Sequence, residues 1–234
     1  MKKFGLILLS VIPVILNAQN NVPLNYQEVD SKWIHFGFLL GLNAFDYTIK
    51  LNPDYVKTDS LTADVISLKP GFHVACVASL RLNDYMDLRA SPGMSFGARH
   101  IYFQGTPKSD NTREMKIEFY PIELPLTLKL KADRISNYRP YLTTGFTMRY
   151  DMASTKKFDE ENKIYVKFKR FDAYYGFGFG VDYYFTFFKL STEARMDFGL
   201  RDMLKHDPHP SYPQYTQIFK SITSNLIYLT FCFE

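Results

Sequence analysis

The chain has 234 residues, a formal net charge of +4 and 17% aromatic residues, with 17 Tyr and 21 Phe against a single Trp. The mild charge, without a Lys/Arg cluster interleaved with aromatic residues, argues against a nucleic-acid-binding protein. The aromatic excess is typical of β-strands and of the girdles of membrane barrels rather than of a helical bundle. After the N-terminal stretch, no apolar run approaches the roughly 20 residues that a transmembrane helix requires.

The N-terminus has the pattern of a secretory signal peptide. A basic start is followed by an apolar run over residues 4–16 and then by Ala18, a small residue suited to cleavage. A membrane anchor is the weaker alternative because the run is too short to span a bilayer. We therefore expect a signal peptide over residues 1–18, a short periplasmic segment over 19–32 and one barrel domain over 33–234.

Two stretches near the N-terminus alternate with a period of two, which is typical of strands. Residues 33–43 form the first strand, and residues 70–99 form a long hairpin with its turn at Asn83-Asp84. In each strand one face is apolar and the other mixes glycine with charge. This contrast predicts the wall of a transmembrane β-barrel.

Five further strands follow the hairpin along the chain. They are expected over 115–131, 138–152, 171–185 and 189–200 and in a last strand with Leu229, Phe231 and Phe233 in phase. In the first of them the apolar phase changes near Tyr120-Pro121, which predicts a β-bulge there. Long and short connections alternate, as in bacterial barrels with short periplasmic turns and longer extracellular loops. The prediction is an all-β, eight-stranded antiparallel up-and-down transmembrane barrel in the outer membrane, with outer-membrane lipid around it.

Composition decides which face of the wall lines the lumen. A secreted lipocalin-like barrel is apolar inside, but here the apolar face is too rich in bulky side chains for a small cavity. The opposite face carries charges of both signs, which could pair inside a barrel to offset their desolvation. We expect a structural network of lumen charges from Arg81, Asp87, Arg89, Arg99, Glu123, Arg149, Asp172, Asp182, Glu193, Arg195 and Asp197. Ion conduction or signal relay is the weaker alternative because side chains fill an eight-stranded barrel.

Tyrosines lie near both kinds of connection, as two interfacial girdles require. Those near the short turns are Tyr85, Tyr138 and Tyr183, and those near the long loops are Tyr47, Tyr102, Tyr120 and Tyr150. The cysteines, Cys76 and Cys232, fall on opposite faces by parity. They cannot form a disulfide, which needs Cβ atoms roughly 4 Å apart.

Motifs for catalysis or metal binding are weak. His35 and His73 lie on the lumen faces of neighbouring strands, but two imidazoles without a third ligand do not define a metal site. His206 and His209 have a metal-like spacing, although the adjacent prolines favour a rigid turn. There is no G-x-S-x-G, no serine in an activating context and no phosphate-binding motif. We expect no cofactor, no metal, no small-molecule substrate and no enzymatic activity.

Several blocks of the sequence resemble the PorT family of outer-membrane barrels of the Bacteroidetes. The matching blocks are WIHFG, GLN and DY within residues 33–47, KPGF, LRLNDY, LR, PG, F and R within 69–99, ELPL over 123–126 and YRPY over 138–141. The resemblance implies an outer-membrane component of the type IX secretion system. That system exports proteases, adhesins and gliding proteins with a C-terminal sorting domain. The resemblance to the PorT family assigns no catalytic residues to this chain.

The sequence is compatible with three different functions. The protein is either a structural or assembly factor of the type IX translocon, or a stand-alone small barrel for adhesion or envelope integrity, with a lipocalin-like carrier as a third possibility. For a translocon factor, we expect contacts with other secretion components at the turn of Asn83 and Asp84, at the turn over 132–137, or in the loop over 201–220.

Overall fold

The computed structural model of the chain describes residues 23–26, 30–53, 62–64, 70–104, 113–152, 166–207 and 214–234. Within these ranges, the side chains of residues 62–64, 99–104, 113–118 and 214–215 are not described. The expected signal peptide over 1–18 lies outside the described residues, so its cleavage stays a prediction.

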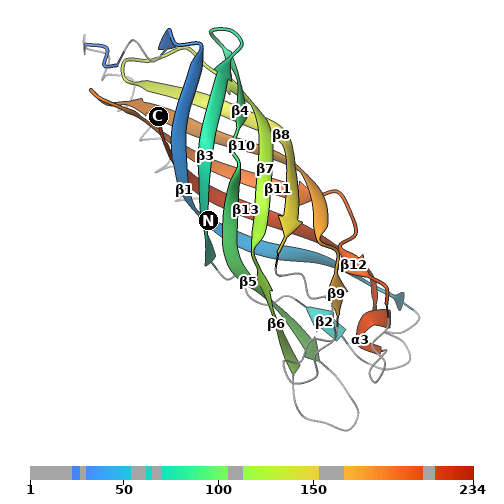
Figure 1. Cartoon of the computed structure of the whole chain (residues 1–234). Coiled ribbons are helices and arrows are strands. Elements are labelled where there is room, and N and C mark those ends of the chain that lie inside the picture. The colour runs from blue at the N-terminus through green and yellow to red at the C-terminus, as the bar shows by residue number, and fades with distance from the viewer. Residues whose placement is uncertain are drawn as a thin grey trace, which may run out of the picture.

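The wall is a closed ring of antiparallel strands (Figure 1). Its eight segments are β1 (Ile34–Leu51), β3 (Pro70–Arg81), β4 (Met86–Ala90) with β5 (Gly93–Gln104), β6 (Arg113–Phe119) with β7 (Pro121–Lys131), β8 (Tyr138–Asp151), β10 (Phe171–Tyr184), β11 (Lys189–Gly199) and β13 (Phe219–Phe233). Each segment pairs with the next in chain order, and β1 also pairs with β13, which closes the ring. The predicted eight-stranded up-and-down barrel is confirmed.

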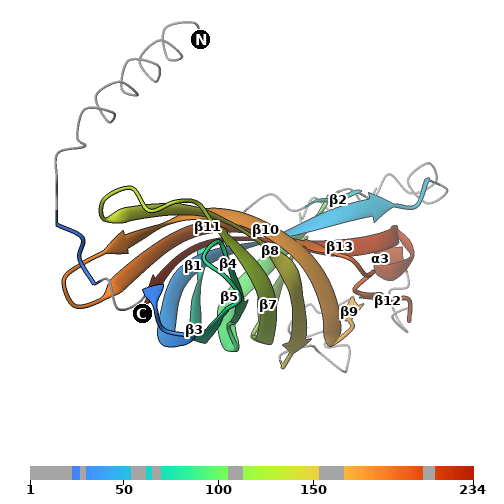
Figure 2. The ribbon, with the colours of Figure 1, turned by 90° about the horizontal axis from the view of Figure 1, so that it is seen from above.

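Small elements gather at the end of the long connections (Figure 1). β2 (Thr62–Asp64) pairs with β5, β9 (Lys167–Phe168) pairs with β12 (Leu204–Lys205), and α3 (Gln214–Gln217) precedes β13. At the opposite end lie the short turns, the C-terminus and the described N-terminal residues (Figure 2). None of the helices in the described part of the chain has the length and apolar character needed to cross a bilayer.

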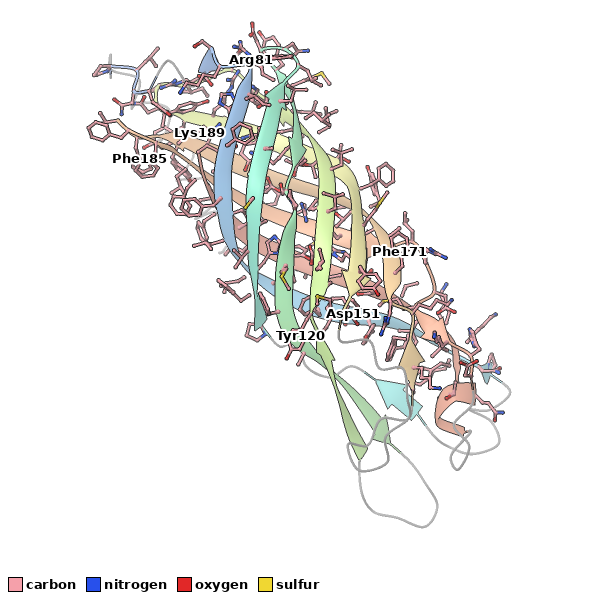
Figure 3. The ribbon with its side chains drawn as sticks, viewed as in Figure 1. Arg81, Tyr120, Asp151, Phe171, Phe185 and Lys189 are labelled. Carbon is pink, nitrogen blue, oxygen red and sulfur yellow. The ribbon has the colours of Figure 1, made fainter. Side chains whose placement is uncertain are left out.

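Alternation along the wall strands puts apolar side chains outside and polar ones inside (Figure 3). On β1 the outward apolar residues run from Ile34 to Ala44. Ten residue steps of about 3.3 Å, at a strand tilt of about 40°, make an apolar band about 25 Å tall, as a bilayer core requires. The lipocalin-like alternative, which needs the inverse arrangement, does not fit this wall.

Beyond this band the polarity of the two faces is reversed. On β1 the outward residues become Asp46, Thr48 and Lys50, whereas Phe45 and Tyr47 point inward and are buried. The strand therefore continues to Leu51 and does not end at Asn43 as the apolar pattern predicted. Tyr47 was expected in the outer girdle, and that expectation is wrong, because the strand has left the lipid at this level.

The predicted β-bulge near Tyr120-Pro121 is also wrong. Phe119 pairs with Gly97 and Ile122 with Met94, so both strands advance by the same number of residues and the register does not shift. Apolar residues change face here because the chain crosses from the polar extension into the lipid band, not because a residue is inserted. A register shift does occur on β1, between Lys50 and Leu51.

Candidate functional site: a charged lumen closed at both ends

Most of the predicted lumen charges lie buried inside the barrel. Those buried are Asp87, Arg89, Glu123, Arg149, Asp172, Asp182, Glu193 and Asp197, and the side chain of Arg195 is only 10% exposed. Arg81 lies instead at the mouth on the short-turn side, with 27% of its side chain exposed. The side chain of Arg99 is outside the described part of the chain. Parity placed these groups on the inner face, and the tertiary structure decides which of them meet.

One cluster is centred on Arg149 of β8. Its guanidinium forms ion pairs with Asp197 of β11 and, at 3.4 Å, with Glu123 of β7, and donates a hydrogen bond of 3.0 Å to the hydroxyl of Tyr228. The Tyr228 hydroxyl in turn contacts both Glu123 oxygens at 2.9 and 3.1 Å. The ring of Tyr174 lies 3.9 Å from the Arg149 guanidinium carbon. Five wall strands, β7, β8, β10, β11 and β13, are thus linked through one buried cation.

A second cluster fills the lumen nearer the short turns. Lys129 Nζ lies 2.7 Å from both carboxylate oxygens of Asp182, and Ser191 donates a further hydrogen bond of 2.5 Å to that carboxylate. The Lys129 Nζ is also 3.8 Å from the ring centre of Tyr141. Because both partners of this pair are almost completely buried, neither charge would be tolerated alone.

Arg89 connects this region to the C-terminal residue of the chain. Its guanidinium lies 3.3 Å from Glu193 and 3.9 Å from the side chain of Glu234, which also pairs with Lys189. The backbones of Lys189 and Glu234 exchange two hydrogen bonds. The end of the chain is thus fixed by side-chain charge and by the sheet.

Sequence reasoning missed several members of these clusters: Lys129, Lys131, Lys189 and Glu234. Lys131 pairs with Asp87 at 2.6 Å. All four have the parity of identified lumen residues on their strands, so alternation could have found them. The three lysines lie at alternate positions from Glu123 on β7 and from Glu193 on β11, and Glu234 continues the alternation just after the last residue of β13.

Glycines on the inner face of β10 leave room for the clusters. A Cβ built on Gly176 would collide with the Asp197 carboxylate, and one on Gly180 would collide with the ring of Tyr141. The repeated glycines at alternate positions therefore provide space for side chains of the two neighbouring strands, because Gly176 pairs with Asp197 of β11 and Gly180 with Tyr141 of β8.

The mouth at the short-turn end is crossed by an N-terminal strap, which we define as residues 23–26 and 30–33. Asp30 accepts a hydrogen bond of 3.0 Å from the Tyr184 hydroxyl and forms ion pairs with Arg134 and Arg139 at 3.3 and 3.4 Å. Arg81 donates to the Asp30 carbonyl oxygen. Three arginines from different strands and turns thus converge on one acidic residue.

A second part of the strap is held by the turn between β7 and β8. The backbone N–H of Asn25 donates to the side chain of Asn137 at 2.9 Å, and Arg134 donates to the Asn25 carbonyl at 2.5 Å. The Asn137 side chain also donates to the carbonyl of Pro23 at 3.2 Å. These contacts keep the strap over the mouth.

The predicted contact residues Asn83 and Asp84 lie in the exposed turn between β3 and β4. The Asn83 side chain accepts a hydrogen bond of 2.8 Å from the backbone N–H of Tyr85, which shapes the turn. Asp84 pairs with Arg81, and its carbonyl accepts a hydrogen bond of 2.7 Å from Arg139. Both residues are accessible from the periplasm, and their contacts link the turn to the strap's arginines.

An apolar cluster closes the opposite end of the lumen. Phe45 packs edge-on against Phe119 at 4.9 Å, and Tyr47 stacks on Phe168 of β9 at 5.6 Å. Other members come from the wall and from the segments between strands: Val166, Tyr174, Met203, Leu204, Ile218, Phe219, Ile222, Leu226 and Tyr228. In the part of the chain that the structure describes, these buried side chains fill the outer end of the lumen, as expected for a barrel of eight strands.

Asp202 fastens the outer segments to the wall. Its carboxylate accepts backbone hydrogen bonds from Ile222 at 2.9 Å and Leu204 at 3.1 Å and lies 3.0 Å from His206. Partial burial of Asp202 opposes ionisation, but these hydrogen bonds outweigh it, so that the pKa of the carboxyl is lowered. The negative form is the one that holds the segment in place.

The two lumen histidines do not share a ligand. His35 pairs with Ser79 on β3, whereas His73 is six residues further along that strand, about 20 Å away at 3.3 Å per residue. His73 Nδ1 contacts the Ser95 hydroxyl at 3.0 Å. His73 and Ser95 are both buried, so a substrate could not reach the serine in this conformation. Within the described side chains, no group of three His, Cys, Asp or Glu could hold a metal ion.

Sequence comparison identifies the family. Residues 17–205 match the model of the outer membrane protein beta-barrel domain. The chain belongs to this family. It therefore resides in the outer membrane, surrounded by lipid, as the exposed apolar band requires. No curated protein has a significant sequence match to the chain.

Three solved structures are similar to that of the chain. Neisserial surface protein A has a TM-score of 0.45 and 13% identity, covering 86% of this chain and 98% of its own. AlkL in lipid bilayers has a TM-score of 0.43 and 12% identity, covering 92% and 96%. The protease OmpT from Escherichia coli has a TM-score of 0.46 and 12% identity, covering 86% and 95%. At these levels the likeness says nothing about the function of the family member described here.

Proposed function

We propose that the protein is a non-enzymatic component or assembly factor of the type IX secretion system, needed for export of cargo with a C-terminal sorting domain. The observation that carries the proposal is the lumen, which is filled with paired charges and closed by the strap on one side and the apolar cluster on the other. A barrel of this kind acts through its ends and its outer surface, not as a conduit for cargo.

The secretion system itself is inferred from the resemblance to the PorT family. The blocks concerned, over residues 33–43 and 80–85, form the start of β1 and the turn between β3 and β4. Both lie at the periplasmic end of the barrel, beside the strap. This end is where a periplasmic or membrane partner would meet the protein.

A clean deletion tests the proposal. We expect sorting-domain cargo to accumulate unprocessed in the periplasm while other outer-membrane proteins remain at normal levels. Cargo that still reaches the surface would overturn the role in secretion.

Complementation of the deletion then maps the contact surface. Three variants replace the turn at Asn83-Asp84, the turn over 132–137 or the loop over 201–220. They should distinguish a segment that contacts a partner from one that only supports the fold. We expect at least one of them to insert normally, as judged by its heat-modifiable mobility on gels, yet fail to restore export. Full export with every variant would exclude these three segments as the interface.

A stand-alone barrel for adhesion or envelope integrity is the second candidate. It is favoured by the extension beyond the lipid band, where paired polar residues of β1 and β13 present an outward surface, including the hydrogen bond of 2.8 Å from Asn225 to Thr48. In that case the deletion strain should export cargo normally but lose surface attachment or become sensitive to detergents.

A further inference from the structure

The arginines at the periplasmic mouth come from several parts of the barrel. Arg81 ends β3, Arg134 lies in the β7–β8 turn, Arg139 is near the start of β8, and Tyr184 ends β10. All four contact Asp30 of the strap. Figure 3 shows Arg81 at this end of the barrel. We call the four side chains Arg81, Arg134, Arg139 and Tyr184 the arginine cradle.

The barrel holds two of these guanidinium groups in place without help from the strap. Arg139 donates hydrogen bonds of 2.8 Å to the carbonyl of Ala132 and 2.7 Å to the carbonyl of Asp84. Arg134 donates a hydrogen bond of 2.9 Å to the carbonyl of Ser136. In each arginine these bonds leave the Nη1 nitrogen for the carboxylate of the strap.

The backbone of the β7–β8 turn is shaped for the same arrangement. Ser136, whose carbonyl accepts the hydrogen bond from Arg134, has a φ of 55°, which is uncommon for a residue other than glycine. The Arg134 guanidinium carbon also lies 3.7 Å from the ring centre of Tyr184. Strained backbone of this kind persists where the surrounding structure holds it, and it is concentrated at functional sites. The cradle is therefore preorganised.

The strap, by contrast, lies on the cradle as a ligand would. Residues 23–26 form neither helix nor strand. Besides the Asp30 carboxylate, the strap offers main-chain carbonyl groups, and those of Asn25 and Asp30 accept hydrogen bonds from Arg134 and Arg81. Every peptide has such carbonyl groups, so another extended segment with an acidic residue could make the same contacts.

One aspartate does not saturate the cradle. In the part of the chain that the structure describes, Arg134 and Arg139 form ion pairs with Asp30 alone, at 3.3 and 3.4 Å. Good charge-assisted hydrogen bonds between nitrogen and oxygen are about 2.7–2.9 Å long. When the strap leaves, both arginines lose this partner, whereas Lys189 deeper in the lumen keeps Glu234. An acidic group is what the open mouth then lacks.

The position of the cradle argues against a lipid headgroup as its ligand. Arg139 and Tyr184 are buried at inward-facing positions of β8 and β10. The cradle therefore lies inside the ring of strands, where the mouth faces the periplasm, and not on the surface that contacts the bilayer.

We propose that the arginine cradle binds an acidic residue in an extended peptide segment of a periplasmic protein, and that the strap occupies this site as an internal ligand. A tethered strap competes at an effective concentration of about millimolar, so the mouth stays closed until the strap is released or displaced. The site goes beyond the proposed role in secretion, because binding of an acidic segment does not depend on a particular secretion system.

A fluorescent peptide with the sequence of residues 23–33 tests the cradle in trans. The receptors are the full-length wild type and Asp30→Asn, each in detergent micelles, and fluorescence anisotropy measures binding. We expect Asp30→Asn to bind the peptide about tenfold more tightly than the wild type does, because its own strap occupies the site less often. A peptide that itself carries Asp30→Asn should bind to neither receptor.

Two arginine variants provide the matched comparison. In the Asp30→Asn background, Arg134→Gln should abolish binding of the peptide. Arg201→Gln, which removes an exposed arginine after β11 at the opposite end of the barrel, should leave binding unchanged. Heat-modifiable mobility on gels confirms that each variant is folded.

Asp30→Lys is a second receptor, whose strap is repelled by the cradle even if the asparagine strap stays in place. Absence of binding to both receptors, or equal binding of the two peptides, would overturn the proposal. Acetate that displaces the peptide more strongly than chloride at equal ionic strength would show that the cradle takes free carboxylates and not a peptide.

Discussion

At the residue scale, the lumen is organised by charges that cannot be separated. Arg149 contacts two carboxylates and two tyrosines, and Lys129 contacts one carboxylate and one tyrosine. A charge in this interior loses the stabilisation it had in water, and only paired and hydrogen-bonded partners offset the loss. The close match of positive and negative groups is thus a requirement of the filled barrel.

We predict that Arg149→Met destabilises the barrel by about 3–5 kcal/mol, because it leaves Glu123 and Asp197 buried without their shared cation. Urea unfolding in vesicles measures the effect. The double variant Arg149→Met/Glu123→Gln should recover part of the loss, since Asp197 keeps its ion pair of 3.1 Å with Arg195 and Glu123 no longer carries a buried charge.

Lys220→Met is the matched control for Arg149→Met. Lys220 is exposed on β13, and its substitution should change the free energy of unfolding by less than about 0.5 kcal/mol. Equal effects of the two single variants would contradict the importance of the buried network.

A substitution at Gly97 tests the packing of the apolar cluster at the outer end of the lumen. A Cβ at this position would collide with the ring of Phe45 and meets no other group closely. We expect Gly97→Ala to destabilise the protein by about 1–3 kcal/mol through overpacking. In a Phe45→Leu background the same substitution should cost much less, and a double-mutant cycle of unfolding free energies measures the coupling. Additive effects would show that the ring is free to move away.

At the scale of elements, the strap and the turns behave as one unit at the periplasmic mouth. Arg134 contacts the strap at Asp30 and Asn25, and Arg139 joins Asp30 to the turn of Asp84. Charge-assisted hydrogen bonds of this kind are stronger than neutral ones. Loss of one acidic residue should therefore release a segment of about ten residues.

We predict that Asp30→Asn accelerates trypsin cleavage after Lys32 in folded protein, because the strap must leave the mouth to enter a protease site. Mass spectrometry of the released N-terminal peptide gives the rate. Asp133→Asn, which removes another exposed acidic residue from the same end, should leave the rate unchanged. Cleavage at the wild-type rate in Asp30→Asn would mean that the carboxylate does not anchor the strap.

At the scale of the whole molecule, the barrel reverses its polarity where it leaves the membrane. Within the apolar band the interior is charged and the exterior apolar, and beyond it the interior is apolar and the exterior polar. Both arrangements have one cause. The outward side chains match the surrounding medium, lipid or water, and the alternate side chains of each strand, which have the opposite polarity, fill the interior. The result is a lumen that is filled with charge at one level and with aromatic rings at the next.

We therefore predict no steady open-channel conductance when the protein is reconstituted in planar bilayers, with a porin as the positive control. The reason is that fully buried side chains, among them Arg149, Tyr174 and Tyr228, fill the lumen. Stable ohmic steps in single-insertion records would contradict a filled lumen and reopen the conduction alternative.

Alternation and connection length alone predicted the barrel, its strand number and most strand boundaries, such as residues 138–152 against the observed Tyr138–Asp151. These features are local, since a strand in a bilayer must turn every second side chain to lipid. The same reasoning failed at Tyr47 and Tyr120-Pro121, because it assumed lipid on the outside along the whole strand. A change of apolar phase has two physical causes, an inserted residue or a change of surrounding medium, and the sequence does not distinguish them.

For the candidate site, the sequence by itself determined which side chains enter the lumen, since parity is a property of each strand. Only the tertiary structure decided the partners, because Arg149 and Glu123 sit on adjacent strands, whereas Arg149 of β8 reaches past β10 to Asp197 of β11. It also decided that Asp30, outside any strand, returns to the mouth and meets Arg134 and Arg139. Pairing inside a closed ring depends on register and curvature, which are set by all eight strands together and by no single stretch of the chain.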